Sequence, residues 1–207
     1  MNPAWPLPDP DAERAEVAAQ VGDALAVRLA AVRLLILDCD GIMTAGKLVY
    51  GADGETLKEF DARDGLGLMM LWAGGVARAV LTGRTSLMVE RRCTELKFEA
   101  IRMGRFDKQQ ALEEIWAETG ATAAETLYMG DDLLDLPTLV AAGVAVTVPG
   151  APDEVRAVCD HVTTAAGGDG AVREVCDLLL KSRGGLAAAI TALAGAGRPA
   201  DDPEVTH

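Results

Sequence analysis

Four groups of polar residues in this 207-residue chain could carry out chemistry, and each follows a mostly apolar stretch: Asp38-Cys39-Asp40-Gly41, Thr82-Gly83-Arg84, Lys108 and Gly130-Asp131-Asp132. An Asp-x-Asp pair alone is a weak signal, because such pairs are common in solvated turns. Here the pair follows the apolar run 32–37, and residues two apart in an extended chain point the same way. Asp38 and Asp40 therefore share one side, and two adjacent carboxylates need a cation or a shared proton.

Asp131 adds a further carboxylate after another predicted strand, 126–129. The chain has only two histidines, so carboxylate oxygens dominate any metal site, and they favour a hard cation such as Mg²⁺. The same scarcity of histidine argues against a Ser-His-Asp triad. Asp132 and Asp135 have a second interpretation, which is that they cap the helix that follows them.

Thr82, Arg84 and Lys108 offer hydrogen-bond donors to phosphate oxygens, and the forked guanidinium of Arg84 suits them well. The alternative for Lys108 is an ordinary solvated helix position. Charge counting favours the first interpretation, because residues 78–108 contain eight basic and four acidic groups, a net +4 within a chain of −13. The pattern predicts an anionic substrate.

Strands and helices alternate around these groups. Strands are predicted at 32–37, 77–81, 100–101, 126–129 and 144–148, and helices at 11–30, 65–73, 86–96, 107–119, 135–142, 152–158 and 170–183. The alternation predicts an α/β fold, a Rossmann-like open parallel sheet with helices on both faces and ligands at the carboxyl ends of the strands. One segment differs: 47–60, with the turn 51–54, predicts a β-hairpin insertion after the first strand.

Domain boundaries follow from composition. Residues 1–30 are predicted to be a leader and helix, 31–183 a single domain, and 184–207 a flexible tail rich in Gly and Ala. The apolar part of the tail, 186–194, is too short to span a bilayer. The acidic charge argues against nucleic-acid and membrane binding, and four scattered cysteines fit a cytoplasmic protein.

The four groups, in this order and at strand ends, resemble the motifs of the haloacid dehalogenase superfamily of phosphatases, in particular its capless branch. Segments 35–41, 60–65, 81–84 and 167–177 are similar to those of the sugar-acid phosphatases that act on 3-deoxy-D-manno-octulosonate 8-phosphate in lipopolysaccharide precursor synthesis. The resemblance runs from about Val32 to Arg183, and it implies a phosphoric monoester hydrolase.

Roles for individual residues follow from the resemblance. It implies that Asp38 is the nucleophile that forms an aspartyl-phosphate, and that Asp40 is the general acid and base. It implies that Thr82 and Lys108 hold the phosphoryl group. The Mg²⁺ ligands would be the Asp38 carboxylate, the Asp40 backbone carbonyl and Asp131.

Substrate contacts are implied for nine residues: Asp40, Asp61, Ala62, Arg63, Asp64, Gly65, Arg84, Arg92 and Lys108. Relatives commonly carry a basic residue where this chain has Met69, so one contact to the sugar acid is expected to be missing. Ordinary helix packing is the alternative interpretation of Met69.

The spacing between the four groups leaves no room for a cap domain. An open site can be covered by a neighbouring subunit, and the resemblance implies a homotetramer that assembles through the 47–60 hairpin, with a tail able to reach a neighbouring site.

Three alternatives remain: a phosphatase for a nine-carbon sugar-acid phosphate, a phospho-accepting signalling domain, and an inactive scaffold. Arg84 favours the eight-carbon substrate by resemblance. Signalling domains place their acidic pair before the phosphorylated Asp, whereas here the extra acidic group follows Lys108.

Overall fold

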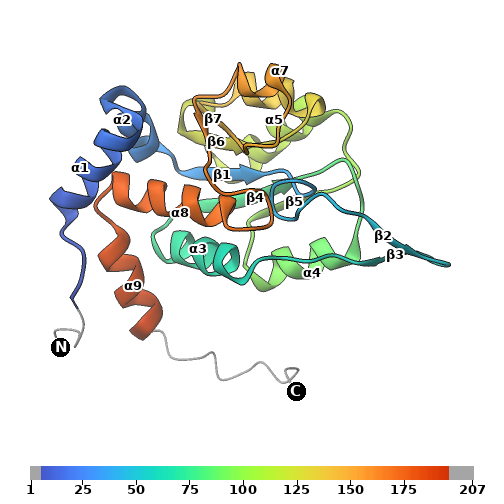
Figure 1. The fold of residues 1–207 in the computed structure, drawn as a ribbon, viewed down its shortest axis with the longest axis horizontal. Helices are drawn as coiled ribbons and strands as arrows, with labels where there is room; N and C mark the ends of the chain where they lie inside the picture. Colours follow the sequence, from blue (N-terminus) through green and yellow to red (C-terminus); the bar gives the residue numbers. More distant parts are fainter. Residues whose placement is uncertain (1–5, 196–207) are drawn as a thin grey trace.

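A six-stranded parallel sheet forms the centre of the protein in the computed structural model, which describes residues 6–195 (Figure 1). The spatial order is β5-β4-β1-β6-β7-β8. The strands are β1 (Leu34–Leu37), β4 (Ala77–Leu81), β5 (Ala100–Arg102), β6 (Thr126–Met129), β7 (Val144–Thr147) and β8 (His161–Val162). The predicted α/β fold is confirmed, and β8 is an additional short strand that the sequence analysis did not predict.

The topology places the chain reversal at β1. From β1 the chain builds β4 and β5 on one side, then returns to build β6, β7 and β8 on the other. Leu34 of β1 lies between Ala77 of β4 and Thr126 of β6. Open α/β sheets bind ligands beyond the carboxyl ends of the strands at such a reversal. Asp38, directly after β1, is therefore at the expected position.

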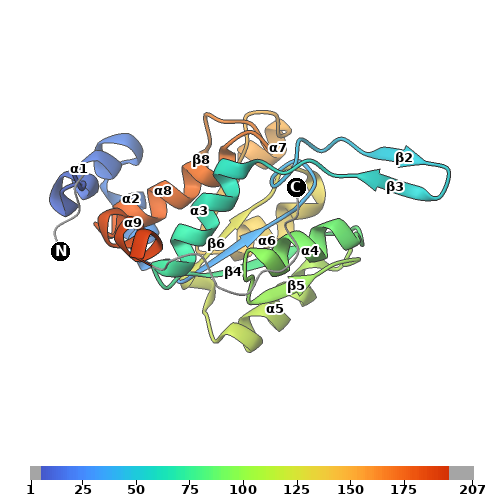
Figure 2. The same ribbon diagram turned by 90° about the horizontal axis from the view of Figure 1, so that it is seen from below.

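Helices cover both faces of the sheet (Figures 1 and 2). One face carries α3 (Ala62–Ala73), α4 (Leu87–Glu95) and α8 (Ala171–Ser182), and the other carries α5 (Lys108–Thr119), α6 (Leu136–Ala141) and α7 (Asp153–Arg156). Two 3-10 turns, η1 (Ala123–Glu125) and η2 (Leu133–Asp135), flank β6. Every residue of β1 and β6 is buried, as expected of central strands covered on both sides.

The predicted hairpin is present as β2 (Val49–Gly51) and β3 (Gly54–Leu57), a separate antiparallel sheet that projects beyond the carboxyl end of the central sheet (Figures 1 and 2). Its strands are shorter than predicted. The tip turns tightly where Gly54 adopts a positive φ of 118°, a conformation that favours glycine. Among residues 6–195 the structure contains no cap domain, so this hairpin is the insertion between β1 and α3.

Both ends of the chain differ from the prediction. The single helix predicted at 11–30 is two helices, α1 (Pro10–Val21) and α2 (Asp23–Ala31), because Gly22 takes a positive φ of 83° between them. The flexible tail predicted from 184 instead contains α9 (Leu186–Gly195), which packs against α3 and α8. Its alanine-rich sequence has high helix propensity, and Ala189 is buried by the packing. Residues 1–5 and 196–207 lie outside the described residues.

None of the helices described within residues 6–195 combines the length and the apolar character needed to cross a membrane.

Candidate active site

A pocket at the carboxyl ends of β1, β4 and β6 collects the strand-end residues. Its lining combines the four polar groups predicted from the sequence with two exposed apolar side chains, Phe106 and Leu134. The complete lining is Asp38, Asp40, Thr82, Gly83, Arg84, Phe106, Lys108, Asp131, Asp132, Leu134 and Asp135. In one chain the fold therefore brings together every residue predicted to act on the phosphoryl group or to hold the metal.

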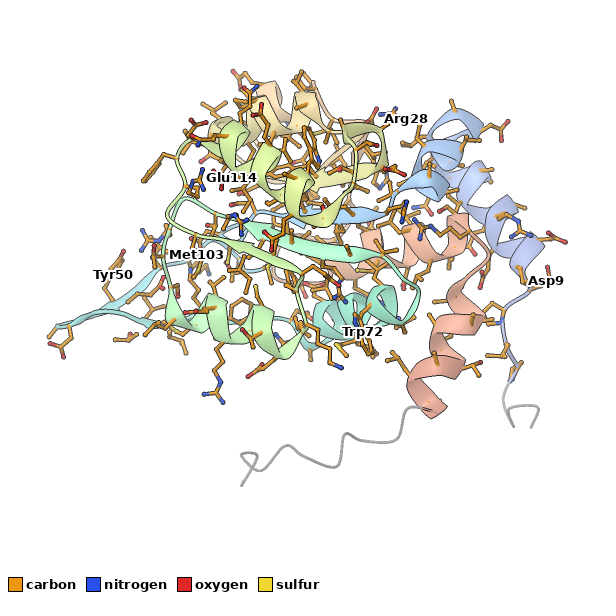
Figure 3. All side chains as sticks on the ribbon, turned by 180° about the vertical axis from the view of Figure 1, so that it is seen from behind. Asp9, Arg28, Tyr50, Trp72, Met103 and Glu114 are labelled. Carbon is orange, nitrogen blue, oxygen red and sulfur yellow. The ribbon has the colours of Figure 1, made fainter. Side chains whose placement is uncertain are left out.

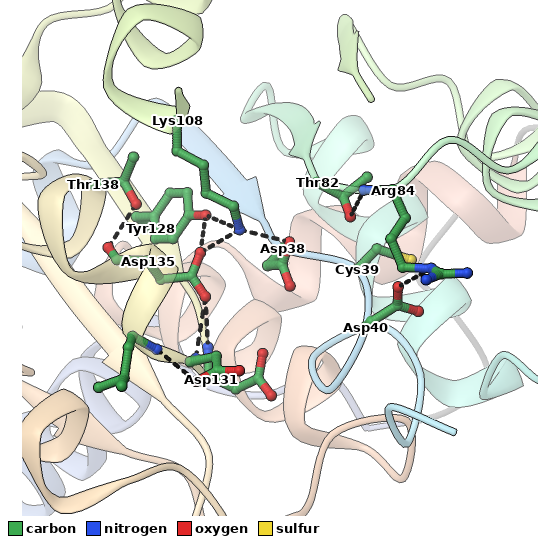
Figure 4. Close-up of polar contacts among 12 residues, drawn as sticks. Asp38, Cys39, Asp40, Thr82, Arg84, Lys108, Tyr128, Asp131, Asp135 and Thr138 are labelled. Carbon is green, nitrogen blue, oxygen red and sulfur yellow. Dashed lines mark hydrogen bonds and ion pairs between the residues drawn. The ribbon is translucent and has the colours of Figure 1, made fainter. Parts of the chain in front are cut away.

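Asp38 occupies the centre of the site (Figure 4). Its side chain accepts a hydrogen bond of 2.9 Å from Lys108 Nζ. Burial raises the pKa of Asp38 to about 6, although the positive charge of Lys108 opposes this shift. Cys39, the next residue, is fully buried and takes no part in the pocket lining, as its alternation with Asp38 and Asp40 predicts.

Lys108 is fixed by a buried network rather than solvated. Lys108 Nζ donates to Asp135 Oδ1 at 2.5 Å, and the hydroxyl of Tyr128 donates to the same oxygen at 2.6 Å. Burial lowers the pKa of Lys108, but Asp38 and Asp135 outweigh it and raise the pKa overall. The ammonium group therefore stays charged and lines the pocket, so Lys108 is not an ordinary solvated helix residue.

Asp135 takes part in the site and in a capping box, in which Asp132 is the N-cap of η2 and Asp135 is the third residue. Its Oδ2 accepts hydrogen bonds from the backbone amides of Asp131 and Asp132, at 3.1 and 3.2 Å, while Oδ1 holds Lys108 and Tyr128. A side chain on Gly130 would collide with Asp135, since a Cβ there would lie 2.5 Å from its carboxyl carbon. The helix-capping interpretation is thus compatible with a place in the site, and neither Tyr128 nor this network was predicted from the sequence.

The side chain of Asp131 lies against Gly41, in the loop that follows β1. A Cβ on Gly41 would lie 1.9 Å from Asp131 Oδ2, so glycine is required at position 41 for this approach. Burial and, to a smaller extent, the charges of Asp38 and Asp135 raise the pKa of Asp131 to about 7. Oδ1 of Asp131 is buried without a hydrogen-bond partner in the structure. A buried oxygen left in this state is costly unless another group binds it.

The donor set fits a hard divalent cation. Asp38, Asp131 and Asp135 each place one carboxylate oxygen within 4.8 Å of the others. Both oxygens of Asp135 already accept hydrogen bonds, whereas Asp131 has a free buried oxygen. Oxygen ligands of this type suit Mg²⁺. The predicted pair of ligands, Asp38 and Asp131, is therefore available, and Asp135 orients its neighbours.

Asp40 and Arg84 lie on the opposite side of Asp38 from Lys108 (Figure 4). The Oδ1 of Asp40 accepts a hydrogen bond from Lys58 Nζ, and its Oδ2 lies 3.6 Å from Arg84 Nε. Lys58 also lies 3.1 Å from Glu55 Oε1. We call Asp40, Glu55, Lys58 and Arg84 the hairpin-base cluster. Lys58 and Glu55 were not predicted from the sequence, because a charged residue in a short hairpin usually faces solvent.

Thr82 and Arg84 come from the end of β4. Thr82 is buried and Arg84 is partly exposed at the pocket wall. The guanidinium of Arg84 donates to the hydroxyl of Tyr50 and lies 5.8 Å from the centre of its ring. Tyr50 belongs to the projecting hairpin (Figure 3), so the hairpin reaches Arg84 as well as Asp40.

The segment 61–65 and Arg92 are not part of this pocket. Asp61, Asp64, Gly65 and Arg92 line a separate small cavity between α3 and α4, and Ala62 and Arg63 are exposed. Burial raises the pKa of Asp64 to about 6, and its carboxylate accepts a hydrogen bond from the Arg173 amide at the start of α8. Within a single chain, these residues, which were predicted to contact the substrate, do not line the pocket that contains Asp38.

The positive segment 78–108 contributes less to the pocket than its charge count predicted. Of its eight basic groups, only Arg84 and Lys108 line the pocket. Arg78 is fully buried against Glu99, while Arg102 and Arg105 pair with Glu114 on α5. The Arg78–Glu99 pair is already counted in the local +4, and the pairs with Glu114 offset part of it.

The Gly167-Gly168 pair supports the loop that carries Asp40. A Cβ on Gly167 would lie 1.7 Å from the Gly41 carbonyl oxygen, and the Gly168 amide donates to the Ile42 carbonyl at 2.9 Å. Backbone therefore packs directly on backbone here. This contact gives a structural reason for the glycines of segment 167–177, on which part of the family resemblance rests.

Comparison with known proteins agrees with this geometry. Residues 79–175 match the haloacid dehalogenase-like hydrolase family. The chain is 39% identical over 141 residues to the 3-deoxy-D-manno-octulosonate 8-phosphate phosphatase of Haemophilus influenzae, an alignment that covers 68% of this chain and 78% of the relative. The chain belongs to the haloacid dehalogenase-like hydrolases. The predicted family and the predicted class, a phosphoric monoester hydrolase, are confirmed.

Solved structures of this hydrolase family superpose well on the chain. The phosphatase of Moraxella catarrhalis, in complex with a magnesium ion, a phosphate ion and a KDO molecule, has a TM-score of 0.79 at 38% identity and covers 83% of this chain and 98% of its own. A cobalt-bound form of the phosphatase from Haemophilus influenzae has a TM-score of 0.75 at 39% identity, covering 76% and 92% respectively. These relatives are hydrolases, which argues against the signalling-domain alternative.

Proposed function

We propose that this hydrolase removes phosphate from 3-deoxy-D-manno-octulosonate 8-phosphate with the help of Mg²⁺, a step of lipopolysaccharide precursor synthesis. The observation that carries the proposal is the meeting of Asp38, Asp40, Lys108 and Asp131 around one pocket, in a chain 39% identical to phosphatases of that substrate. The pocket combines a cluster of carboxylates with two cations, as a phosphate ester bound beside a metal requires.

In the first half of the reaction, an Asp38 carboxylate oxygen attacks phosphorus, and the bond between phosphorus and the sugar oxygen breaks. Asp40 gives its proton to the leaving sugar oxygen. Attack on a phosphate dianion meets a repulsion of about 4 kcal/mol per charge pair at about 4 Å. Lys108 and Thr82 offset this repulsion, because they can donate to the phosphoryl oxygens.

In the second half, Asp40 accepts a proton from water, and the water oxygen attacks the phosphorus of the aspartyl-phosphate. The bond to Asp38 breaks and inorganic phosphate is released, which restores both carboxyl groups. Mg²⁺, held by Asp38, the Asp40 carbonyl and Asp131, would supply positive charge to the phosphoryl oxygens.

The hairpin supports a proposal about assembly. Leu48, Val49, Tyr50 and Leu57 are 41–58% exposed, which is unusual for large apolar side chains in one small hairpin. We propose that hairpins of four subunits pack together and that the exposed part of segment 61–65 reaches the substrate of a neighbouring subunit. A monomer by analytical ultracentrifugation at micromolar concentration would contradict this assembly.

Phosphate release measured over a panel of sugar phosphates with Mg²⁺ tests the proposed reaction. We expect the eight-carbon sugar-acid phosphate to give the highest kcat/KM and EDTA to abolish turnover. A clear preference for the nine-carbon sugar-acid phosphate would overturn the choice of substrate. Met69 packs against the hydrophobic core and does not line the pocket. Within the pocket of one chain, discrimination between the eight-carbon and the nine-carbon acid therefore depends on Arg84 and the residues around it.

Four free cysteines within the described chain fit the reducing cytoplasm that we propose as the site of this reaction.

A further inference from the structure

Lys58 is a buried cation beside the pocket whose function the proposed reaction leaves unexplained. It follows β3, where the hairpin returns to the body of the protein. Only 1% of its side chain is exposed, and Lys58 is absent from the pocket lining. It therefore stands behind Asp40 and does not face the substrate.

Burial of an ammonium group is expensive unless anions surround it. Lys58 has two such partners, Asp40 Oδ1 and Glu55 Oε1. Burial lowers the pKa of Lys58, but its hydrogen bonds to these carboxylates raise the pKa overall. The group is thus a fixed positive charge, and its partners are held in place by the need to neutralise it.

The two oxygens of Asp40 have different surroundings. Oδ1 accepts the hydrogen bond from Lys58, whereas Oδ2 is buried and has no hydrogen-bond partner in the structure. Arg84 Nε lies 3.6 Å from Oδ2 and also has no hydrogen-bond partner. One oxygen of Asp40 is therefore bound to Lys58, and the other has no hydrogen-bond partner.

We propose that Lys58 is the positioning residue for Asp40. By holding Oδ1, it turns Oδ2 toward the leaving oxygen of the substrate, and it couples the hairpin to proton transfer at the site. The inference rests on the proposed role of Asp40 as general acid and base, and it predicts that Lys58 matters to the first half of the reaction only when the leaving group needs a proton.

The test compares two classes of phosphate ester, whose leaving groups differ in whether they need a proton. p-Nitrophenyl phosphate releases a stable anion without a proton, whereas phenyl phosphate and sugar phosphates release strongly basic oxygens. We expect Lys58→Met to lower kcat/KM, which covers the steps up to formation of the aspartyl-phosphate, by about 10²-fold for phenyl phosphate and for the sugar phosphate. We expect less than about a 3-fold change in kcat/KM for p-nitrophenyl phosphate, because its leaving group needs no proton. Lys58→Arg, which keeps a charged donor, should recover part of the loss.

A double mutant examines whether Lys58 acts through Asp40. If it does, adding Lys58→Met to Asp40→Asn should change kcat/KM for phenyl phosphate no further, because a residue that acts through another gives non-additive effects. Lys181→Met is the matched control, since Lys181 is ion-paired to Glu16 far from the pocket. It should leave all activities unchanged.

Equal losses on both classes of ester, or losses that add to those of Asp40→Asn, would overturn the proposal and leave Lys58 with a structural role. The outcome is separable from the test of substrate. An enzyme that ignores the eight-carbon sugar-acid phosphate would refute the proposed function, while the two aryl phosphates would still report on Lys58.

Discussion

Two charged clusters flank the catalytic pocket, and their charge balance differs. On one side, Asp38, Asp131 and Asp135 surround a single cation, Lys108, which leaves two formal negative charges in excess. We call these four residues the unbalanced cluster. On the other side, the hairpin-base cluster pairs two carboxylates with two cations and is formally neutral. The first cluster needs a further cation to balance its charge, whereas the second is formally neutral without one.

The pKa values of the two clusters reflect this difference. In the first, burial and mutual repulsion raise the pKa of Asp131 to about 7, and burial raises that of Asp38 to about 6. In the second, burial would raise the pKa of Glu55, but Ser86, Lys58 and Arg84 lower it overall. The raised pKa values belong to the cluster that we propose to hold the metal and the nucleophile, and the lowered pKa belongs to the hairpin-base cluster, in which we propose that Lys58 positions Asp40.

The largest effect is expected at the centre of the unbalanced cluster. Asp38→Asn should lower kcat by about 10³-fold or more, because an amide oxygen is a poor nucleophile. Phosphate-release kinetics measure the loss. The oligomeric state of the variant, measured by sedimentation, should stay that of the wild type. Substantial residual turnover would refute Asp38 as the nucleophile.

Asp135→Asn should give the next largest effect, on stability as well as on rate. It breaks the buried pair with Lys108, so we expect a loss of about 3 kcal/mol in the free energy of unfolding, measured by urea denaturation. We also expect a lower kcat, because Lys108 loses one of the two anions that orient it. Tyr128→Phe is the control, since it removes one hydrogen bond to Asp135 and keeps the ion pair. Equal effects of the two substitutions would contradict this view of the ion pair.

Asp131→Asn should stabilise the metal-free protein by about 1–2 kcal/mol at about pH 8. The folded pKa of Asp131 lies above its unfolded value, so the ionised group opposes folding above pH 7. This penalty shrinks as the pH falls from about 7 to about 4, and the variant and wild type should then converge. Thermal unfolding in EDTA over this range measures the difference. With saturating Mg²⁺ the order should reverse, because the wild type keeps its ligand. A variant that is less stable than wild type in EDTA at about pH 8 would show that Asp131 carries no such penalty.

The smallest effect is expected for Glu55→Gln in the hairpin-base cluster, which is formally neutral. Its pKa is lowered by the fold, so the ionised carboxylate stabilises the protein above its unfolded pKa, and this contribution is lost as the pH falls. We expect a loss of about 1 kcal/mol near neutral pH, and this difference should fade only below the ordinary pKa of 4.5, as the pH falls through the lower folded pKa. Stabilisation by the substitution near neutral pH would mean that this cluster, too, carries unbalanced charge.

The unbalanced cluster was largely predictable from the sequence. Asp38, Thr82 and Asp131 each follow an apolar run, and the carboxyl ends of parallel strands meet at one edge, so their convergence required only the correct fold class. The role of Tyr128 was hidden, because it lies inside a buried strand and looks like a core residue. Asp135 looked like a helix cap, and it is the third residue of a capping box whose N-cap is Asp132.

The hairpin-base cluster was not predictable by the same reasoning. Lys58 is 18 residues from Asp40, and nothing in the alternation of the hairpin distinguishes a lysine that turns inward from one that faces water. The charge count over 78–108 failed for a related reason. Net charge along the chain does not reveal which acidic partners on α5 will neutralise a basic group.

By itself, the sequence determined the α/β fold, the hairpin insertion, the family and the identity of the strand-end carboxylates, because apolar periodicity and strand-end position are local properties of the chain. Only the tertiary structure decided which charges are buried together, that Lys108 is held by Asp135 and Asp40 by Lys58, and that segment 61–65 lies outside the pocket of its own chain. Ion pairing and desolvation depend on distances between segments far apart in sequence, and those distances exist only once the chain has folded.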